Sequence, residues 1–300
     1  MENVKYHKEY TMDTLSDLNR VHKDQNFFWV DSSLSGVAAW SGKRYSQGLP
    51  TLASAYAKTT ASKGDVIYVS PFHTETTTAV LTVAKAGVQI VAKKLGNQRP
   101  VITGNAAVDT ISLEAAGCKV SGLEFAAPAT DAQTADVNIA AARCSVEDTI
   151  HHGSTTALNK VNMITLTAAA SYALIDGVRM HNTTVEVPAA IAVEGALTGA
   201  EIRNCFIFDT IGYTNGALAD AATALSLYIH HNVFTNVKAD TVVMAFASNS
   251  TGVCSFNHIN GRHTTLASNV TAGTGMAFFE NRVVEQAAVN GAIIPAADTD

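Results

Sequence analysis

A six-residue pattern recurs along this chain at intervals of about 27 residues. In the four clearest copies the first and sixth places are apolar, as is the fourth in three of them, while the second is polar and the third is tolerant of turns. Looser copies begin at Ile90, Val146, Phe256 and Phe279. A fixed period of this size predicts a stack of repeated units. The clearest copies are Val120-Ser121-Gly122-Leu123-Glu124-Phe125, Ile175-Asp176-Gly177-Val178-Arg179-Met180, Ile202-Arg203-Asn204-Cys205-Phe206-Ile207 and Ile229-His230-His231-Asn232-Val233-Phe234.

The repeated unit is predicted to be built from strands. Apolar residues alternate in short runs rich in Val and Ile, which is typical of strands and not of amphipathic helices. A second apolar run precedes most copies by about ten residues, at 110–113, 137–139, 164–166, 191–193 and 242–244. Two or three short strands in each turn of about 27 residues indicate an all-β chain folded as a single-stranded parallel β-helix. We expect about eight to nine rungs, about 4.8 Å apart.

The third place of the pattern predicts a sharp corner in each rung. Its residue types are those most often found with positive φ. We therefore expect one left-handed corner to recur in register as a structural column. The predicted column consists of Gly122, Asp148, Gly177, Asn204, His231, His258 and Asn281.

Composition argues against several classes of protein. The formal net charge is −6 and no long run of Lys or Arg occurs, so nucleic-acid binding is not expected. No stretch is apolar enough to predict a membrane-spanning helix, and the first 27 residues are polar, without the apolar core of a secretory signal. These features predict synthesis in a cytoplasm. The four cysteines fall in apolar columns and are expected to be reduced core residues.

Charged residues make up only 15% of the chain, although a solenoid has a large surface for its core. We therefore expect neighbouring subunits or a larger assembly to cover part of the outer face. The alternative is a solvated surface rich in Ala and Thr.

The chain is predicted to divide into an N-terminal arm at 1–27, a strand and capping helix at 28–63, and the β-helix at 64–300. A helical pattern opens at Pro50, with Leu49, Leu52, Ala53 and Tyr56 on one face. Solenoids need a cap over the open end of the core. We expect Trp29, Leu52 and Tyr56 to form that cap.

Several motifs at the start of the repeat carry a resemblance. The run Gly64-Asp65-Val66-Ile67-Tyr68-Val69 is followed by Pro71-Phe72-His73-Thr74-Glu75-Thr76, then by a rung at 87–96 and by Arg99-Pro100. The chain resembles pectin-lyase-like right-handed β-helices in these segments and, more narrowly, a group of tailed-phage virion proteins. The resemblance extends from Phe27 over nearly the whole chain. It implies a right-handed helix and a virion role, with trimers suited to capsid threefold axes.

One acidic constellation is a weak candidate for catalysis. Stacking of rungs is expected to place Glu147 and Asp176 beside Asp148 on one side and Arg203 on the other. Paired carboxylates with a nearby cation are what polysaccharide lyases and hydrolases require, but such residues are equally expected as surface ion pairs. We expect no catalytic residue, no metal site and no cofactor.

Histidines occur as the consecutive pairs His151-His152 and His230-His231. Neighbours in a strand point to opposite faces, so neither pair is expected to bind one metal through both rings. His231 and His258 are expected to stack in the corner column.

The sequence favours a virion structural protein without enzymatic activity. The predicted role is capsid decoration or cement: a homotrimer on the outside of the virion's major capsid protein shell. The alternative is a tail spike or fibre that binds or cleaves host surface polysaccharide. A bacterial β-helix enzyme is a further alternative, which the missing signal peptide disfavours.

Overall fold

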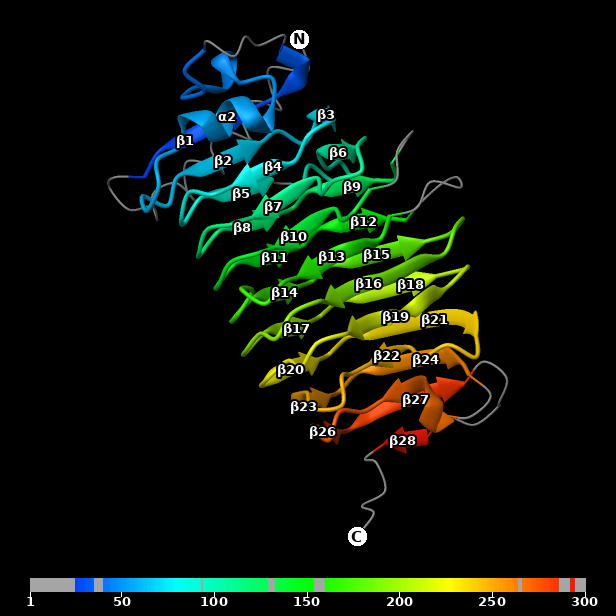
Figure 1. The fold of residues 1–300 in the computed structure, drawn as a ribbon. Helices are drawn as coiled ribbons and strands as arrows, with labels where there is room; N and C mark the ends of the chain where they lie inside the picture. Colours follow the sequence, from blue (N-terminus) through cyan, green and yellow to red (C-terminus); the bar gives the residue numbers. More distant parts are fainter. Residues whose placement is uncertain are drawn as a thin grey trace.

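The computed structural model describes residues 25–34, 40–92, 94–128, 133–153, 160–263, 266–285 and 292–294. These residues form a right-handed parallel β-helix of about 8 turns, stacked as one rod (Figure 1). The predicted all-β fold class is therefore confirmed. All but the last three residues of the predicted arm at 1–27 lie outside the described residues.

Three sheets of mainly parallel strands run along the rod, and each complete turn contributes one strand to each sheet. Sheet A contains β1 Phe27–Val30, β2 Val66–Val69, β5 Gln89–Ala92, β8 Lys119–Ser121, β11 Ser145–Glu147, β14 Leu174–Asp176, β17 Glu201–Arg203, β20 Leu227–His230, β23 Thr251–Ser255 and β26 Gly275–Phe279. Sheet B contains β3 Thr74–Thr77, β6 Val101–Gly104, β9 Glu124–Ala126, β12 Ile150–His152, β15 Arg179–Asn182, β18 Phe206–Asp209, β21 Val233–Ala239, β24 His258–Arg262, β27 Asn281–Glu285 and the antiparallel β28 Ala292–Ile294. Sheet C contains β4 Leu81–Val83, β7 Ile111–Leu113, β10 Val137–Ile139, β13 Asn162–Leu166, β16 Val187–Val193, β19 Tyr213–Asp220, β22 Met244–Ala245 and β25 Val270–Thr271.

The core lies between the three sheets and is built from inward columns in register. Val120 pairs with Val146, which pairs with Ile175, and Ile175 pairs with Ile202. All four side chains are fully buried. Each apolar residue thus packs on its counterpart in the next rung, which is why the pattern repeats in the sequence. The chain passes from sheet A through a tight corner to sheet B, then by a longer loop to sheet C.

The corner residues have left-handed backbone. Gly122, Asp148, Gly177, Asn204 and His231 have φ values between 49° and 78°. A Cβ at Gly122 would lie 2.1 Å from the carbonyl oxygen of Ala92, so this corner requires glycine.

The last two members of the predicted column are wrong. Phe256 and Glu280 hold the left-handed corners, with φ of 56° and 49°, while His258 and Asn281 begin the following strands β24 and β27. Cys254 pairs with Ile229 in register, two residues earlier than the apparent copy at Phe256. The rung shortens here, so a period carried forward from earlier rungs overshoots.

An asparagine ladder runs beneath these corners. Asn257 Oδ1 accepts hydrogen bonds from Asn232 N at 3.0 Å and Asn232 Nδ2 at 2.9 Å, and Asn281 Oδ1 accepts the equivalent pair from Asn257. All three side chains are buried. Asn281 is therefore a ladder residue one place after the corner, not the corner itself.

The N-terminal end is covered by the helix α2 Leu52–Lys58, with the short 3₁₀ turns η1 Ser32–Leu34 and η2 Tyr45–Gln47 nearby along the chain (Figure 1). Thr51 and Ser54 form a capping box, so the helix begins after Pro50 and Thr51. Leu52 is 1% exposed. The expected face is wrong at Ala53, which is exposed, while Ala55 is buried.

Tyr56 packs against the core, as expected of a cap residue. Trp29 does not: its neighbours Phe28 and Val30 belong to the core, while the Trp29 ring packs edge-on against Tyr68 at 4.5 Å on the outer face of sheet A. All four cysteines are buried and carry free thiols. No helix in the described part of the chain is long and apolar enough to cross a membrane.

Candidate functional site

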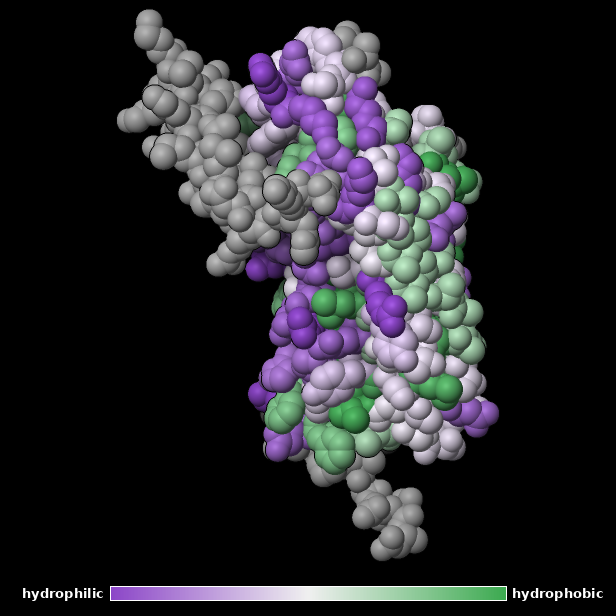
Figure 2. Space-filling view, turned by 90° about the vertical axis from the view of Figure 1, so that its left-hand side faces the viewer, coloured by the Kyte–Doolittle hydropathy of each residue, from purple (hydrophilic) through white to green (hydrophobic). Residues whose placement is uncertain are grey.

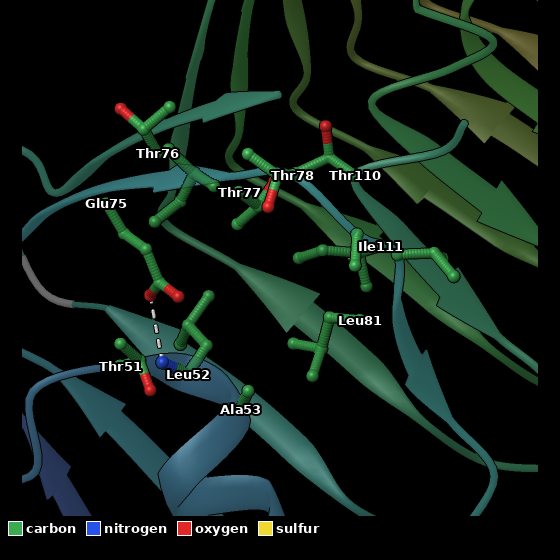
Figure 3. Close-up of a pocket in the computed structure, with 13 residues that line it drawn as sticks. Thr51, Leu52, Ala53, Glu75, Thr76, Thr77, Thr78, Leu81, Thr110 and Ile111 are labelled. Atoms are coloured by element: carbon green, nitrogen blue, oxygen red, sulfur yellow. Dashed lines mark hydrogen bonds between the residues drawn. The ribbon is translucent and has the colours of Figure 1, made fainter. Parts of the chain in front are cut away.

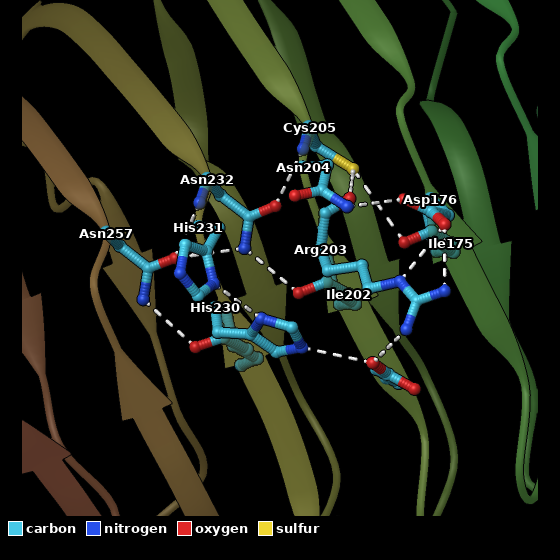
Figure 4. A network of polar contacts seen from close by, with 12 residues as sticks. Ile175, Asp176, Ile202, Arg203, Asn204, Cys205, His230, His231, Asn232 and Asn257 are labelled. Atoms are coloured by element: carbon cyan, nitrogen blue, oxygen red, sulfur yellow. Dashed lines mark hydrogen bonds and ion pairs between the residues drawn. The ribbon is translucent and has the colours of Figure 1, made fainter.

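The predicted acidic constellation lies on the outer face of sheet A. Glu147 pairs in register with Asp176, and Asp176 pairs with Arg203. Arg203 donates to Asp176 Oδ2 through Nε at 3.0 Å and Nη2 at 2.9 Å, and through Nη1 to Glu201 Oε1 at 2.8 Å. His230 Nε2 lies 3.0 Å from the same Glu201 oxygen (Figure 4). The structure therefore connects Asp176, Arg203, Glu201 and His230 in one half-exposed network.

The charges of this network are already paired. Burial raises the pKa of Asp176, but hydrogen bonds from Asn204 and Arg203 outweigh it, and the pKa is lowered overall. The hydrogen bond with Asp176 in turn raises the pKa of Arg203. Asp176 is thus a stable carboxylate rather than a proton donor. Glu147 forms its own ion pair with Lys119.

Asp148 faces away from this network, at the corner between sheets A and B. Arg99 Nη2 and Lys94 Nζ lie 2.9 Å and 3.0 Å from its Oδ1. Burial raises the pKa of Asp148, but these two cations lower it overall. The four candidates therefore do not converge on one centre. Glu147, Asp176 and Arg203 share one outward column of sheet A, whereas Asp148 lies at the corner that directly follows β11.

The expected stack of His231 on His258 is also wrong. His231 stacks instead on Phe256, with ring centroids 5.2 Å apart, because Phe256 holds the next corner. His230 and His231 contact each other through their Nδ1 atoms at 2.8 Å. His151 is buried while the neighbouring His152 side chain is 38% exposed, as the alternation of a strand predicts.

A second set of side chains, not recognised in the sequence, lies on the outer face of sheet B. We call it the sheet-B strip. His152, His181 and Phe208 occupy the same outward position on the adjacent strands β12, β15 and β18. The His181 and Phe208 rings are stacked at 5.4 Å, and Phe208 is stacked on Phe206 at 6.4 Å. The strip consists of Glu124, His152, Arg179, His181, Phe206 and Phe208.

Exposure and charge distinguish the strip from ordinary surface. Phe206 is 48% exposed and Phe208 36%. Glu124 Oε1 lies 2.9 Å from His152 Nε2 at the strip's N-terminal end. The alternation Phe206-Ile207-Phe208, with Ile207 buried, is a sequence signal that would have placed both rings outward.

A shallow pocket of about 430 Å³ opens at the same end of the strip. Leu95, Asn97, Gln98, Arg99 and Glu124 line it. It therefore combines amide, guanidinium and carboxylate groups beside the row of rings. These are groups that hydrogen-bond hydroxyl-rich ligands.

A smaller pocket of about 250 Å³ lies where the cap meets the first turn (Figure 3). Its one acidic side chain is Glu75, whose Oε2 accepts from Leu52 N at 2.9 Å and contacts His73 Nε2 at 3.0 Å. Ser32 N donates to His73 Nδ1 at 3.0 Å, so neutral His73 carries its proton on Nε2 and donates to Glu75. Glu75 thereby joins helix α2 to strand β3.

The outer face of sheet C carries mostly small residues, with carboxylates at its margins. Asn162 Nδ2 donates to Glu194 Oε1 at 2.9 Å, and Ser112 Oγ donates to Glu114 Oε1 at 3.2 Å. Burial raises the pKa of Asp109 at the same face. Among the described residues, no three His, Cys, Asp or Glu side chains are grouped so that they would hold a metal ion.

Comparison with known proteins establishes the fold. No protein-family model matches the chain, and no curated protein matches it. The crystal structure of the pectate lyase Pel9A is similar to this chain with a TM-score of 0.62 at 12% identity, over 87% of this chain and 69% of that chain. A rhamnogalacturonan lyase gives a TM-score of 0.42 at 11% identity, over 85% of this chain and 87% of that chain.

The first of these neighbours corrects one prediction from the sequence. The sequence favours a protein without enzymatic activity, but the solved structure that the chain resembles with a TM-score of 0.62 is a pectate lyase. The shared fold is compatible with such an activity, and the expectation is contradicted. The likeness itself extends to the pectin-lyase-like β-helix fold.

Proposed function

We propose that this protein binds a polysaccharide along the sheet-B strip, in the manner of a tail spike or fibre. The observation that carries the proposal is the row of His152, His181 and Phe208 at one outward position of three adjacent strands. Adjacent strands are about 4.8 Å apart, so the row presents flat rings at a regular spacing. A linear polymer with a short repeat is the ligand that suits such a row.

The chemistry of the strip fits sugars. The C–H face of a sugar ring packs on an aromatic ring, while its hydroxyl groups need hydrogen-bond partners at the edge. Phe206 and Phe208 supply exposed rings, and Glu124, His152 and Arg179 supply polar groups around them. The adjacent pocket with Asn97 and Gln98 extends the polar end. The similarity in fold to a pectate lyase supports a polysaccharide as the ligand class.

The experiment is a binding assay on a panel of acidic and neutral polysaccharides. Phe208→Ala is expected to weaken binding about tenfold or more, because loss of one stacked ring removes on the order of 1.5 kcal/mol. Phe256→Ala is the matched control, since Phe256 is 47% exposed but lies at the corner after sheet A. An equal effect of both substitutions, or no binding by the unaltered protein, contradicts the proposal.

The same polysaccharides should be assayed for cleavage by measuring unsaturated or reducing ends. Asp176→Asn removes the carboxylate held by Arg203 and tests the sheet-A network, while Phe208→Ala tests the strip. Products that persist in Asp176→Asn exclude that network as the source of the activity.

Capsid decoration is a second candidate, favoured by the hydrophobic residues at the C-terminal rungs. Tyr228, Phe256 and Phe279 are 45%, 47% and 53% exposed. On the face shown in Figure 2, polar residues run along one side of the rod, and hydrophobic residues lie among them toward the lower, C-terminal end. Exposed apolar patches mark protein contacts, here with the major capsid protein or a second copy in a homotrimer. Crosslinking on intact particles tests it, and a location only at the tail excludes it.

A further inference from the structure

Three ionisable side chains are buried together at the turn between sheets B and C. Asp136 precedes strand β10, His151 lies in β12, and Lys160 lies shortly before β13. Each has a relative exposure of 0%. Phe125 stacks on the His151 ring at 4.8 Å and closes one side of the group. A wholly buried lysine is rare and calls for a chemical explanation.

Lys160 lies against both oxygens of one carboxyl group. Its Nζ is 2.7 Å from Asp136 Oδ1 and 2.8 Å from Oδ2. The carboxyl carbon, bonded to both oxygens, is therefore within about 3.1 Å of the nitrogen. That is the separation expected of reacting atoms held ready for bond formation. Two further contacts, to the carbonyl oxygens of Ala126 at 3.1 Å and His152 at 2.6 Å, fix the amine in this position.

His151 contacts the same carboxyl group from the other side. Its Nδ1 is 3.0 Å from Asp136 Oδ2, and its Nε2 is 2.9 Å from Thr149 Oγ1. Gln133 Nε2 donates to Asp136 Oδ1 at 3.2 Å. The carboxyl group therefore has a donor on each oxygen as well as a nucleophile at its carbon.

The surroundings favour the uncharged forms of the Lys160 amine and the His151 imidazole. Burial lowers the pKa of Lys160 and also that of His151. Removing charges from water is costly, so the ion pair and the neutral pair of amine and carboxylic acid become closer in free energy than they are in solvent. A proton passed from Lys160 to Asp136 gives the neutral pair, with the nitrogen lone pair facing the carbon.

We propose that Lys160 and Asp136 condense to form an intramolecular isopeptide bond. The Lys160 nitrogen forms a bond to Asp136 Cγ, and the bond between Cγ and one hydroxyl oxygen breaks. His151 Nδ1–H gives its proton to the departing oxygen, which leaves as water. The proton that Lys160 Nζ releases as the amide forms then returns to His151 and restores the imidazole. One amide and one water are produced from one amine and one carboxylic acid, and no oxidant or cofactor is required.

The bond would join two consecutive turns of the β-helix. Asp136 leads into β10 and Lys160 into β13, which are paired strands of sheet C. The product closes residues 136–160 into a covalent ring and restricts the unfolded chain, as a disulfide does. Formation of this bond does not require that the sheet-B strip bind a polysaccharide.

Mass spectrometry of the purified, denatured full chain tests the proposal. The mass is expected to be lower than that of the linear chain by about 18 Da, one water molecule. Fragmentation of a protease digest should find a branched peptide joining Lys160 to Asp136. Lys160→Arg should restore the full mass, whereas Lys119→Arg, which alters the half-exposed pair with Glu147, should keep the deficit.

His151→Phe should slow the appearance of the mass deficit in freshly made protein, because the ring is kept in shape but the proton carrier is lost. Unmodified Asp136 and Lys160 peptides from folded, unaltered protein, with no change on prolonged incubation, would overturn the proposal.

Discussion

Asp209 is the last residue of strand β18, and its side chain points into the interior of the β-helix, where the residue is 1% exposed. Its Oδ1 accepts from Val237 N at 3.1 Å, but its Oδ2 has no hydrogen-bond partner within the described residues. The same holds for Asn182 Oδ1 and Tyr213 Oη in that part of the chain. Burial raises the pKa of Asp209 to about 7. The folded protein therefore retains a proton that the unfolded chain releases.

This proton makes stability depend on pH. The folded-state pKa lies above the ordinary value of 3.8, so the contribution of Asp209 is full below about pH 4 and is lost as the pH rises to about 7. Asp209→Asn should remove this loss and stabilise the protein at pH 8 by up to about 4 kcal/mol. Urea unfolding at pH 4 and pH 8 measures the difference.

Asp176→Asn is the control, since the lowered pKa of Asp176 has the opposite sign. That variant should be slightly less stable at pH 8, within about 1 kcal/mol, because Asp176 belongs to a surface pair. The assignment is contradicted if the unaltered protein becomes more stable between pH 4 and pH 7 and if Asp209→Asn gives no gain in stability at pH 8.

At the scale of elements, the strands were predictable because inward columns repeat in the sequence. The runs at 137–139 and 164–166 fall within β10 and β13 for this reason. The last corners were not predictable from the period, because the rung before Phe256 is shorter. The sheet-B strip was overlooked because its rings come from separate rungs, and only the register of β12, β15 and β18 brings them together.

We expect disruption of the asparagine ladder under the last corners to cause the largest loss of stability. Asn257 Nδ2 donates to Ile229 O at 3.0 Å while Oδ1 accepts from Asn232 N. Asn257→Ala leaves both backbone groups buried and unpaired, and should destabilise the protein by about 3 kcal/mol or more. Asn257→Asp keeps the acceptor but loses the donor. It should destabilise as well, and less so at low pH.

Asn204→Gly provides the comparison, because Asn204 is exposed and its left-handed corner accepts glycine. Its effect should stay within about 1 kcal/mol. Urea denaturation of the three variants separates these outcomes. A loss in Asn204→Gly equal to that in Asn257→Ala would show that the corner backbone, not the ladder, carries the stability.

At the scale of the whole molecule, the rod is a series of turns in which each contacts its neighbours. Stability in such a solenoid is approximately a sum over units and interfaces, so the ends are the weakest points. At the N-terminal end the apolar interior is covered by Leu52 and Ala55 of helix α2, and Glu75 holds the start of that helix through Leu52 N. We infer that this cap protects the first turns specifically.

Leu52→Asp should uncover the end of the core, because it places a charge where the side chain is 1% exposed. Amide hydrogen exchange should then accelerate by tenfold or more in β2 and β5, with little change in β20 and β23. Ala53→Asp is the matched control, since the neighbouring Ala53 is exposed on the same helix. Uniform acceleration along the rod would instead mean that the β-helix unfolds as one unit, and the cap would then stabilise the whole molecule and not its first turns alone.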